Sequence, residues 1–385
     1  MKKIGILTYF RDENAGTFLQ AYAMQGLIRN RWPDHHVELI DCSDRAERFR
    51  FRKGHLHLKR LLEEFRHYRV FRRSRKRYLA LGPTRTVSHD AQALINGIAQ
   101  QDYDLVIVGS DTVFDVYRRG TLTESLPTLM FWLGPEIKAK KVAFAVSSSA
   151  LEVDRIDATL QERLRDRINA FDLVGVRDEA TQHLIQGLGF RGRSKLHGVP
   201  DPTFGLDIDE TGIGLWLARK GVNPGRTAML VNLPWRWGPC RGIIKHFRVR
   251  GIQVVSPGYN PYADVCLLDY SPFEWAGMYR HFRLTVTDRY HGSIFSLRGA
   301  CPVVAVDLAQ QRVTSRGLSK TYCLMRDFGL HETCHVRFME PSQDREVIQK
   351  AEQAMVAFDE QAVQAAVREQ KDQLDQFLNE IDRII

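Results

Sequence analysis

The sequence lacks any apolar stretch long enough to cross a bilayer, which argues against an integral membrane protein. A transmembrane helix needs roughly 20 apolar residues, whereas the longest apolar runs, such as LVIV at residues 105–108, are far shorter. The opening MKKIGILTYF is followed at once by Arg11, Asp12 and Glu13, without the long apolar core or the cleavage site of a secretion signal. The sequence therefore predicts a cytoplasmic protein.

Closely spaced cysteines are also missing. The six cysteines stand at positions 42, 240, 266, 301, 323 and 334, and none forms a C-x-x-C pair. This spacing argues against a disulfide framework and against a structural zinc site, so buried free thiols are expected. No H-x-x-x-H or DxD cluster stands at a predicted strand end, so no metal is expected either.

The positive charge is concentrated in one segment. Residues 45–77 hold fourteen Lys or Arg and three Glu, a net charge of +11, which leaves about −2 for the rest of a chain whose total is +9. Apolar residues recur there at helical spacing: Leu58, Leu61, Leu62, Phe65 and Tyr68. We expect a basic amphipathic helix that lies on an anionic membrane, grips a polyanion, or simply packs its apolar face on the domain.

At 385 residues the chain is too long for one ordinary core, and the alternation of strands and helices occurs twice. Predicted strands cover 3–8, 37–40, 103–108, 141–147, 173–176, 229–233, 252–256, 284–287 and 302–307. Predicted helices cover 18–30, 90–101, 162–171, 179–188, 243–248, 271–281, Ser293 onward, and 346–385 as one or two helices. We therefore predict an α/β protein of two Rossmann-like domains.

The domain limits follow from a break in this alternation. VPDPTF at 199–204 has two prolines that disfavour regular structure, and a linker rich in Gly, Asp and Asn runs to about Gly225. We predict an N-terminal domain over 1–208 with the basic insertion at about 45–80, and a C-terminal domain over 209–342. A helical segment over 343–385 would brace the two.

Polar side chains follow several predicted strands, at the sheet edge where ligands of α/β proteins bind. Asp111 and Arg177 follow two strands of the first half, and Arg289, His291 and Ser293 follow one strand of the second. Asn14 and Gly16, at the start of the first helix, form a second candidate anion cradle, although one Gly is weak evidence. Each residue taken singly has a simpler interpretation as a cap, a turn residue or a solvated charge.

A series of motifs resembles, in order, those of the polysaccharide pyruvyl transferase family. The motifs are KIGILTYFRDENAGTFLQAYAMQ, YDLVIVGSDTVFD, KVAFAVSSS, LVGVRDEAT, VPDPTFGL, VTDRYHGSIFSLRGACPVV and GLSKTYCLMRDFGL. They span roughly residues 1–330, the basic segment excepted. The resemblance implies a GT-B-like glycosyltransferase architecture with the active site between the halves.

The resemblance also implies an activity. Members of this family transfer the pyruvyl group of phosphoenolpyruvate to two hydroxyls of a sugar in a surface or extracellular polysaccharide, giving a cyclic ketal and phosphate. No cofactor besides the donor substrate is implied. Acceptors of such enzymes are often sugars on lipid carriers at the inner membrane face, where the basic helix would hold the enzyme.

The roles implied by the resemblance fall on matching positions of this chain. His291 would be the general acid or base, Asp111 would activate or orient the acceptor hydroxyl, and Arg177 and Arg289 would clamp the donor. Four further residues complete the expected substrate-binding set: Ser293, Asn14, Gly16, and Lys320, which lies in the last motif. Two departures stand out: Phe114-Asp115 replaces the family's frequent Trp-Asn, and Asp288 replaces a Ser before the arginine.

Two other functions remain open at this stage. A GT-B glycosyltransferase using a nucleotide sugar would need the same fold, but the second half shows no Glu-containing nucleotide-ribose motif. A non-enzymatic polyanion-binding protein could use the basic segment, but no regular aromatic platforms for nucleic acid accompany it. The acceptor sugar, the choice of ketal or enol ether, and any homo-oligomer are not fixed by the sequence.

Overall fold

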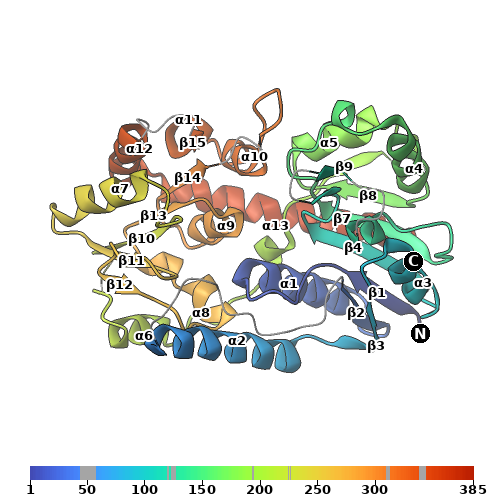
Figure 1. Cartoon of the computed structure of the whole chain (residues 1–385), viewed down its shortest axis with the longest axis horizontal. Coiled ribbons are helices and arrows are strands. Elements are labelled where there is room, and N and C mark those ends of the chain that lie inside the picture. Colours follow the sequence, from blue (N-terminus) through green and yellow to red (C-terminus); the bar gives the residue numbers. More distant parts are fainter. Residues whose placement is uncertain are drawn as a thin grey trace.

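Two parallel sheets, one in each half of the chain, form the framework of the computed structural model, which describes residues 1–43, 58–118, 121–122, 127–192, 195–223, 225, 227–308, 313–337 and 344–385 (Figure 1). The first sheet has the order β3-β2-β1-β4-β7-β8-β9, with β1 (Lys3–Leu7), β2 (His36–Ser43), β3 (Leu81–Val87), β4 (Leu105–Asp111), β7 (Lys140–Val146), β8 (Leu173–Val176) and β9 (Leu196–Gly198). The second has the order β12-β11-β10-β13-β14-β15, with β10 (Ala228–Asn232), β11 (Gln253–Ser256), β12 (Val265–Cys266), β13 (Leu284–Thr287), β14 (Val303–Asp307) and β15 (His335–Arg337). β5 (Tyr117–Arg118) pairs antiparallel with β6 (Thr121–Leu122).

Both sheets have the strand order of a Rossmann fold. Read in chain order, each begins in its middle, grows to one side over three strands, and then reverses to the other side. The reversal lies between β1 and β4 in the first sheet and between β10 and β13 in the second. Nearly all residues of these central strands are buried, and most are apolar, as parallel strands covered on both faces require. The prediction of two Rossmann-like halves is confirmed.

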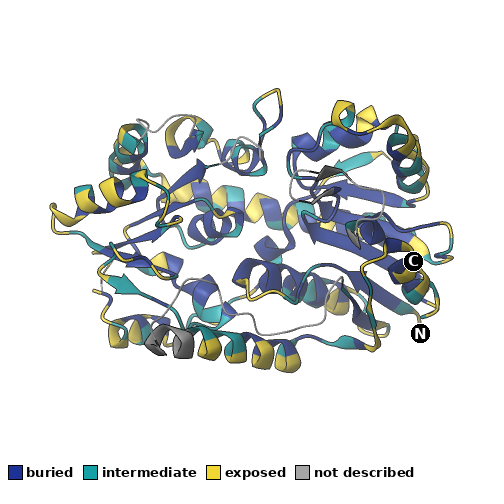
Figure 2. Ribbon diagram, in the orientation of Figure 1, coloured by how far each residue is buried: buried dark blue, intermediate teal, exposed yellow. Residues whose placement is uncertain are grey.

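Helices cover the faces of the two sheets. They are α1 (Ala15–Arg31), α2 (Leu58–Tyr78), α3 (Ala91–Ala99), α4 (Ala158–Asn169), α5 (Glu179–Gly187), α6 (Ile213–Arg219), α7 (Pro239–Arg248), α8 (Pro272–Gly277), α9 (Tyr290–Arg298), α10 (Lys320–Asp327), α11 (His331–Cys334), α12 (Asp344–Ala357) and α13 (Glu360–Asp382). Figure 2 shows the strands dark blue and the outer helix faces yellow, which is the amphipathic pattern that such layers need. Within the described residues, no helix is both long enough and apolar enough to cross a membrane.

The segment expected to be an irregular linker contains regular structure. A 3₁₀ turn occupies Pro202–Gly205 and α6 lies between it and β10. Gly212, with φ +79°, occupies the position before α6 that only a residue tolerant of a left-handed backbone accepts readily. The prediction of a linker through residue 225 was therefore wrong for residues 213–219. The domain limits themselves stay a prediction.

The C-terminal helix α13 contacts both halves of the molecule, as its course across the middle of Figure 1 indicates. In the second half, Gln364 Nε2 donates to the carbonyl oxygen of Arg298 at 3.1 Å. In the first half, the Phe377 ring packs edge-on against Phe144 of β7, with 5.2 Å between the ring centroids. Gly175 of β8 admits this ring, since a Cβ there would lie only 2.6 Å from the Phe377 ring. One helix thus ties the two sheets together.

The basic helix α2 lies along one side of the molecule, beneath both halves in Figure 1. Phe71 is fully buried, and its ring contacts Phe18 of α1. His67 contacts the Tyr270 ring of the second half at 5.1 Å between centroids. The inner face of the described part of α2 is therefore packed on the protein. Residues 45–57 of the predicted basic segment lie outside the described residues.

Candidate active site

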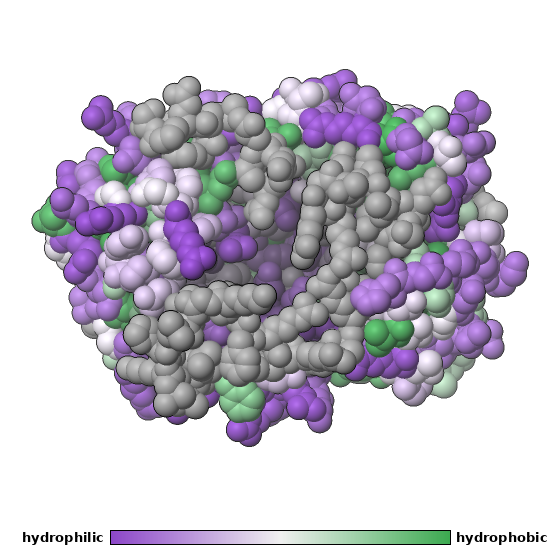
Figure 3. All heavy atoms as spheres, viewed as in Figure 1, coloured by the Kyte–Doolittle hydropathy of each residue, from purple (hydrophilic) through white to green (hydrophobic). Residues whose placement is uncertain are grey.

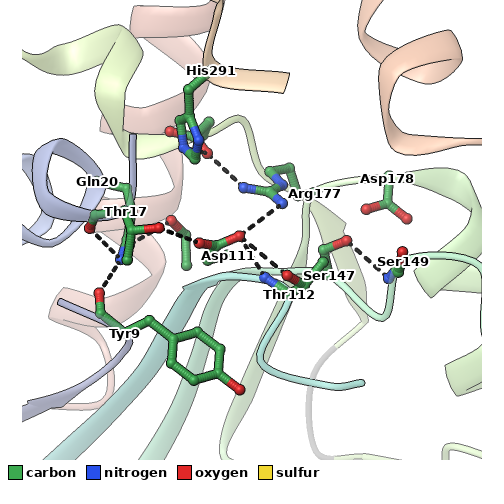
Figure 4. A network of polar contacts seen from close by, with 12 residues as sticks. Tyr9, Thr17, Gln20, Asp111, Thr112, Ser147, Ser149, Arg177, Asp178 and His291 are labelled. Atoms are coloured by element: carbon green, nitrogen blue, oxygen red, sulfur yellow. Dashed lines mark hydrogen bonds and ion pairs between the residues drawn. The ribbon is translucent and has the colours of Figure 1, made fainter. Parts of the chain in front are cut away.

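Asp111 ends β4 at the point where the first sheet reverses. Its backbone has φ +79°, which turns the chain sharply away from the strand. Asp111 Oδ1 accepts a hydrogen bond from the backbone N–H of Thr112 at 2.8 Å, and Oδ2 lies 3.5 Å from Thr17 Oγ1 at the start of α1. The carboxylate is therefore held between the end of β4 and the first turn of α1, as the close view shows (Figure 4).

Gln20 of α1 fixes the two strand ends beside Asp111. Its buried amide nitrogen donates to Thr8 Oγ1 at 2.9 Å and to the Tyr9 carbonyl at 2.8 Å, both at the end of β1. Its amide oxygen accepts from Ser110 Oγ at 2.9 Å, at the end of β4. One side chain thus joins helix α1 to both strands that precede the site.

Arg177 and Asp201 form a fully buried ion pair. Arg177 directly follows β8, and its Nη1 donates to Asp201 Oδ2 at 2.6 Å, while its Nη2 lies 3.8 Å from Asp111 Oδ1. Both side chains of the pair are 0 % exposed. The Nε and Nη2 atoms of Arg177 make no hydrogen bond within the described structure. The guanidinium therefore keeps donor capacity on the side that faces Asp111.

Asp201 serves two neighbours at once because its oxygens face different ways. Oδ1 accepts from the backbone N–H of Thr203 at 3.0 Å and from its hydroxyl at 2.6 Å, which starts the 3₁₀ turn. Oδ2 meets Arg177, and His291 Nε2 of the second half lies 3.4 Å from the same oxygen. This carboxylate thus connects a basic residue of each half.

His291 approaches the first half closely because residue 16 is a glycine. A Cβ at Gly16 would lie 2.4 Å from His291 Nδ1 and 2.5 Å from its Cγ, closer than side-chain carbons normally approach. Asn14 holds this turn, since its side-chain oxygen accepts from the backbone N–H groups of Gly16 and Thr17. The glycine that we expected to cradle an anion instead leaves room for the histidine ring in this structure.

The helix carrying His291 begins earlier than predicted. Thr287 Oγ1 accepts from the backbone N–H of Arg289 at 3.0 Å, which closes a tight turn directly after β13, and α9 begins at Tyr290. The prediction that Ser293 caps this helix was wrong. Ser293 lies inside α9, is fully buried, and donates its hydroxyl hydrogen to the Arg289 carbonyl.

The remaining predicted residues lie at the edge of this cluster. The Arg289 side chain is 52 % exposed, and its Nε lies 3.2 Å from Asp288 Oδ1, so the unexpected carboxylate pairs with the arginine that we expected to bind the donor. Lys320 begins α10, and its Nζ lies 5.4 Å from the centroid of the Tyr290 ring. The Tyr290 ring also contacts Arg177, whose Cζ lies 4.3 Å from the ring centroid.

Charges of opposite sign set the protonation states of the two carboxylates. Burial alone would raise the pKa of Asp111, but Lys320, Arg177 and His291 outweigh it and hold the pKa below its usual range. Burial likewise opposes ionisation of Asp201, yet His291 and Arg177 lower its pKa as well. Burial would lower the pKa of Arg177, but Tyr290 and the carboxylates raise it above its usual value. Both acids are therefore ionised near neutral pH.

The structure thus brings Asp111, Arg177 and His291 together, with Lys320 in electrostatic range, and leaves Ser293 in the helix interior. Sequence reasoning missed Asp201, Tyr290, Thr17 and Gln20. Asp201 was interpreted only as a break between two prolines, although it follows β9 in the way that Asp111 ends β4. The strand-end argument did not reach it, because β9 is only three residues long, has no buried residue and was not predicted as a strand.

A hollow opens in the middle of the face drawn in Figure 3, and hydrophilic residues line its visible walls. The cluster offers a partly accessible imidazole, two carboxylates and several cations, a set suited to proton transfer and to anionic substrates. Among the described residues, no group of three or more His, Cys, Asp or Glu side chains is arranged to hold a metal ion.

Comparison with known proteins adds a family and a fold. The family model described as "Polysaccharide pyruvyl transferase" matches residues 14–309. No curated protein sequence matches the chain.

Among solved structures, the chain is similar to three proteins that are described with UDP compounds. UGT71G1 of Medicago truncatula complexed with UDP-glucose has a TM-score of 0.55 at 9% identity, covering 96% of this chain and 94% of that one. UDP-GlcNAc 2-epimerase of Methanocaldococcus jannaschii has 0.54 at 10%, covering 95% and 98%. The S. aureus MnaA–UDP co-structure has 0.52 at 13%, covering 98% and 97%. At such identities the likeness shows the fold alone, the two-domain GT-B architecture.

Proposed function

Because the chain belongs to the polysaccharide pyruvyl transferase family and is therefore a transferase of polysaccharide biosynthesis, we propose that it transfers the pyruvyl group of phosphoenolpyruvate to two hydroxyls of a sugar. The products are a cyclic ketal and phosphate. The observation on which the proposal rests is the assembly of His291 from the second half with Asp111, Arg177 and Asp201 from the first. The acceptor is a sugar of a surface or extracellular polysaccharide or of its lipid-linked precursor.

The reaction needs a proton donor and a proton acceptor at defined places. A proton added to the methylene carbon of phosphoenolpyruvate makes a methyl group and leaves the adjacent carbon electron-poor. A sugar hydroxyl then forms a C–O bond to that carbon and loses its proton to a base. The second hydroxyl forms the other C–O bond as the bond to the phosphate oxygen breaks, and its proton leaves with phosphate or solvent.

His291 is the residue best placed to move the first proton. Its Nε2 lies 3.4 Å from Oδ2 of the ionised Asp201, which positions the ring between the two halves. The side chain is 11 % exposed, so the ring is partly accessible from outside the cluster. General acid or base catalysis by one such group contributes roughly 10²- to 10⁴-fold in rate.

We assign the acceptor hydroxyl to Asp111 and the anionic groups of the donor to the surrounding cations. Asp111 is ionised and 12 % exposed, which suits a group that orients the acceptor hydroxyl and takes its proton. Arg177 presents unbonded Nε and Nη2 donors, and an arginine can hold a carboxylate or phosphate through two hydrogen bonds. Arg289 and Lys320 add positive charge at the edge. Because the Arg177 side chain is 0 % exposed, donor binding requires the halves to move apart locally.

Binding of the donor is the first test. Calorimetry at moderate salt should detect phosphoenolpyruvate, with inorganic phosphate binding more weakly and UDP-glucose not at all. Arg177→Lys keeps the positive charge but cannot donate two parallel hydrogen bonds to one anionic group, and it should weaken donor binding by about tenfold. Arg167→Lys, a similar change at a half-buried arginine that donates to the Leu129 carbonyl, serves as the control for stability. A preference for UDP-glucose would instead favour a nucleotide-sugar glycosyltransferase.

The enzyme also acts at a membrane surface in this proposal, from the cytoplasmic side. The inner face of α2 packs on the protein, while its exposed residues include Arg66, Arg69, Arg72, Arg73, Lys76 and Arg77. Because these cations point outward and Phe71 is buried on the protein, we expect the contact to be mainly electrostatic. Such a contact would hold the enzyme near a lipid-linked acceptor.

A further inference from the structure

A groove lies on the second half, between α7 and the loop that follows β11. It has a volume of about 470 Å³ and is lined by Arg241, Ile244, Lys245, Arg248, Val249, Pro261 and Tyr262. We call it the α7 groove. None of these residues belongs to the cluster around His291.

The loop that forms one wall of the α7 groove is held in place by a buried asparagine. Asn260 is 1 % exposed, and its side-chain oxygen accepts from the backbone N–H of Tyr262 at 3.1 Å. Its amide nitrogen lies 3.5 Å from Cys240 Sγ of α7, and its backbone N–H donates to Cys266 Sγ of β12. The wall is therefore fixed to both α7 and the sheet, so the groove exists before any ligand binds.

The charges on α7 are divided between two sides. On the side facing α12, Glu352 pairs with His246 and Arg250, and Asp344 lies against Gly242. On the groove side, Arg248 pairs with Asp264 at 2.8 Å. Among the described residues, neither Arg241 nor Lys245 forms an ion pair. The groove therefore holds two cations that no carboxylate of the described chain neutralises.

Aromatic rings accompany these cations. Arg241 Cζ lies 5.7 Å from the Tyr262 ring centroid, within the range of a cation–π contact. Nearby in sequence, the rings of Trp235 and Tyr259 meet edge to face at 6.1 Å, and Tyr259 is 41 % exposed. Flat apolar rings beside a few fixed polar groups are typical of small-ligand sites, and the C–H face of a sugar ring is a suitable partner for them.

The Arg241 end of the α7 groove lies toward the edge of the second sheet that carries the candidate active site. Helix α7 starts after the carboxyl end of β10, and the Tyr262 loop follows the carboxyl end of β11. His291 follows β13, which pairs with β10 in the same sheet. A glycan running along this edge would meet both places.

We propose that the α7 groove binds a carboxylate-bearing sugar of an acidic glycan, through Arg241 and Lys245 at the carboxylate and Tyr262 and Pro261 at the ring. The inference rests on the proposed function and extends it to the acceptor. A pyruvyl ketal itself carries a carboxylate, so a repeat unit that is already modified has the chemistry that the groove recognises. The enzyme would thereby hold an oligomeric or polymeric acceptor while the next unit lies at His291.

The test is a binding titration of the full chain without phosphoenolpyruvate. The acidic probe is a galacturonic acid hexasaccharide, and the neutral probe is maltohexaose. The acidic probe should bind saturably and the neutral one should not. Arg241→Ala should weaken binding by about tenfold and Arg241→Ala with Lys245→Ala by on the order of a hundredfold, because hydrogen bonds to charged groups contribute this much. Arg250→Ala, an exposed change on the α12 side, should leave binding within about twofold.

Three results would overturn the proposal. The neutral probe could bind equally well, or the Arg241 and Lys245 variants could bind the acidic probe unchanged. Inorganic phosphate or phosphatidylglycerol vesicles could also compete for the groove as strongly as the hexasaccharide, which would make it a general anion or lipid site. The Arg177→Lys variant separates this proposal from the previous one, because it should weaken donor binding by about tenfold and leave binding of the acidic glycan unchanged.

Discussion

The charged cluster between the halves and the cationic face of α2 show how burial changes what a charge does. In the cluster, Arg177 and Asp201 are 0 % exposed and each has a matched partner, since an unpaired charge in that environment would be very costly. On α2, the outward-facing cations are surrounded by water and need no matched partner. Single substitutions should therefore have large effects in the cluster and small, additive effects on α2.

Asp201→Asn should have the largest effect, because it leaves the buried Arg177 charge without its anionic partner. Removing one member of a buried ion pair typically costs about 3–5 kcal/mol of folding free energy. Urea denaturation at pH 7 measures the loss, and Asp207→Asn, the same change at an exposed carboxylate, should cost less than about 0.5 kcal/mol. Equal stability of the two variants would contradict the view that the Arg177–Asp201 ion pair stabilises the fold around the charged cluster.

The stability that Asp201→Asn removes should depend on pH. Burial opposes ionisation of Asp201, but His291 and Arg177 prevail and lower its pKa in the folded protein. A carboxyl group with a lowered folded pKa contributes stability that is complete above the pKa of the unfolded chain, about 3.9, and is lost as the pH falls below it. The difference in unfolding free energy between the wild type and Asp201→Asn should thus be constant from about pH 5 to 8 and should shrink below about pH 4. A difference that grew on acidification would show that the carboxylate is not stabilised by these cations.

His291→Ala should reduce turnover by roughly 10²- to 10⁴-fold, because it removes the proposed acid or base. Donor binding, measured by calorimetry, should change much less, since the cations remain. His291→Gln serves as the control, because an amide fills the position and cannot exchange protons in the same way. Turnover of either variant within tenfold of the wild type would remove His291 from the catalytic assignment.

The difference between predicted and observed structure has physical causes in each case. The apolar runs at β4, β7 and β14 and the β-branched residues of β13 identified central strands, because such strands are buried on both faces. The edge strand β3 was missed because it contains Pro83 and mostly polar, exposed residues, which an edge tolerates.

Local turn chemistry and long-range pairing explain the other errors. The start of α9 was placed at Ser293 because serine is a common cap, whereas the Thr287 side chain forms the turn that starts the helix earlier. The candidate residues Asp111, Arg177 and His291 could be found from strand ends alone. The Arg177–Asp201 pair could not, because the two residues are 24 positions apart and join only through the parallel pairing of β8 and β9.

Gln20→Leu tests whether the site depends on its scaffold as well as on its charges. The substitution removes hydrogen bonds to Thr8, Tyr9 and Ser110 and should cost about 1–3 kcal/mol of stability. Gln25→Leu is a matched control, because Gln25 is also buried on α1 but bonds only to the backbone of Ala80. Both variants should lose stability, while Gln20→Leu alone should lower turnover by roughly tenfold to a hundredfold through a displaced Asp111. Equal turnover of the two variants would contradict a positioning role.

The cationic face of α2 should show the smallest effects, each charge contributing about 1 kcal/mol to binding at an anionic membrane surface. Arg72→Ala with Arg73→Ala should therefore weaken sedimentation with phosphatidylglycerol vesicles at low salt by roughly tenfold to thirtyfold. Stability and turnover on a water-soluble acceptor should not change, because both side chains are exposed. Arg345→Ala with Arg368→Ala removes the same net charge from α12 and α13 and should leave sedimentation nearly unchanged. An equal loss in both double variants would show that the total charge of the protein, and not the placement of cations on α2, governs membrane binding. The contrast between paired buried charges and additive exposed charges would then remain, but α2 would have no special part in it.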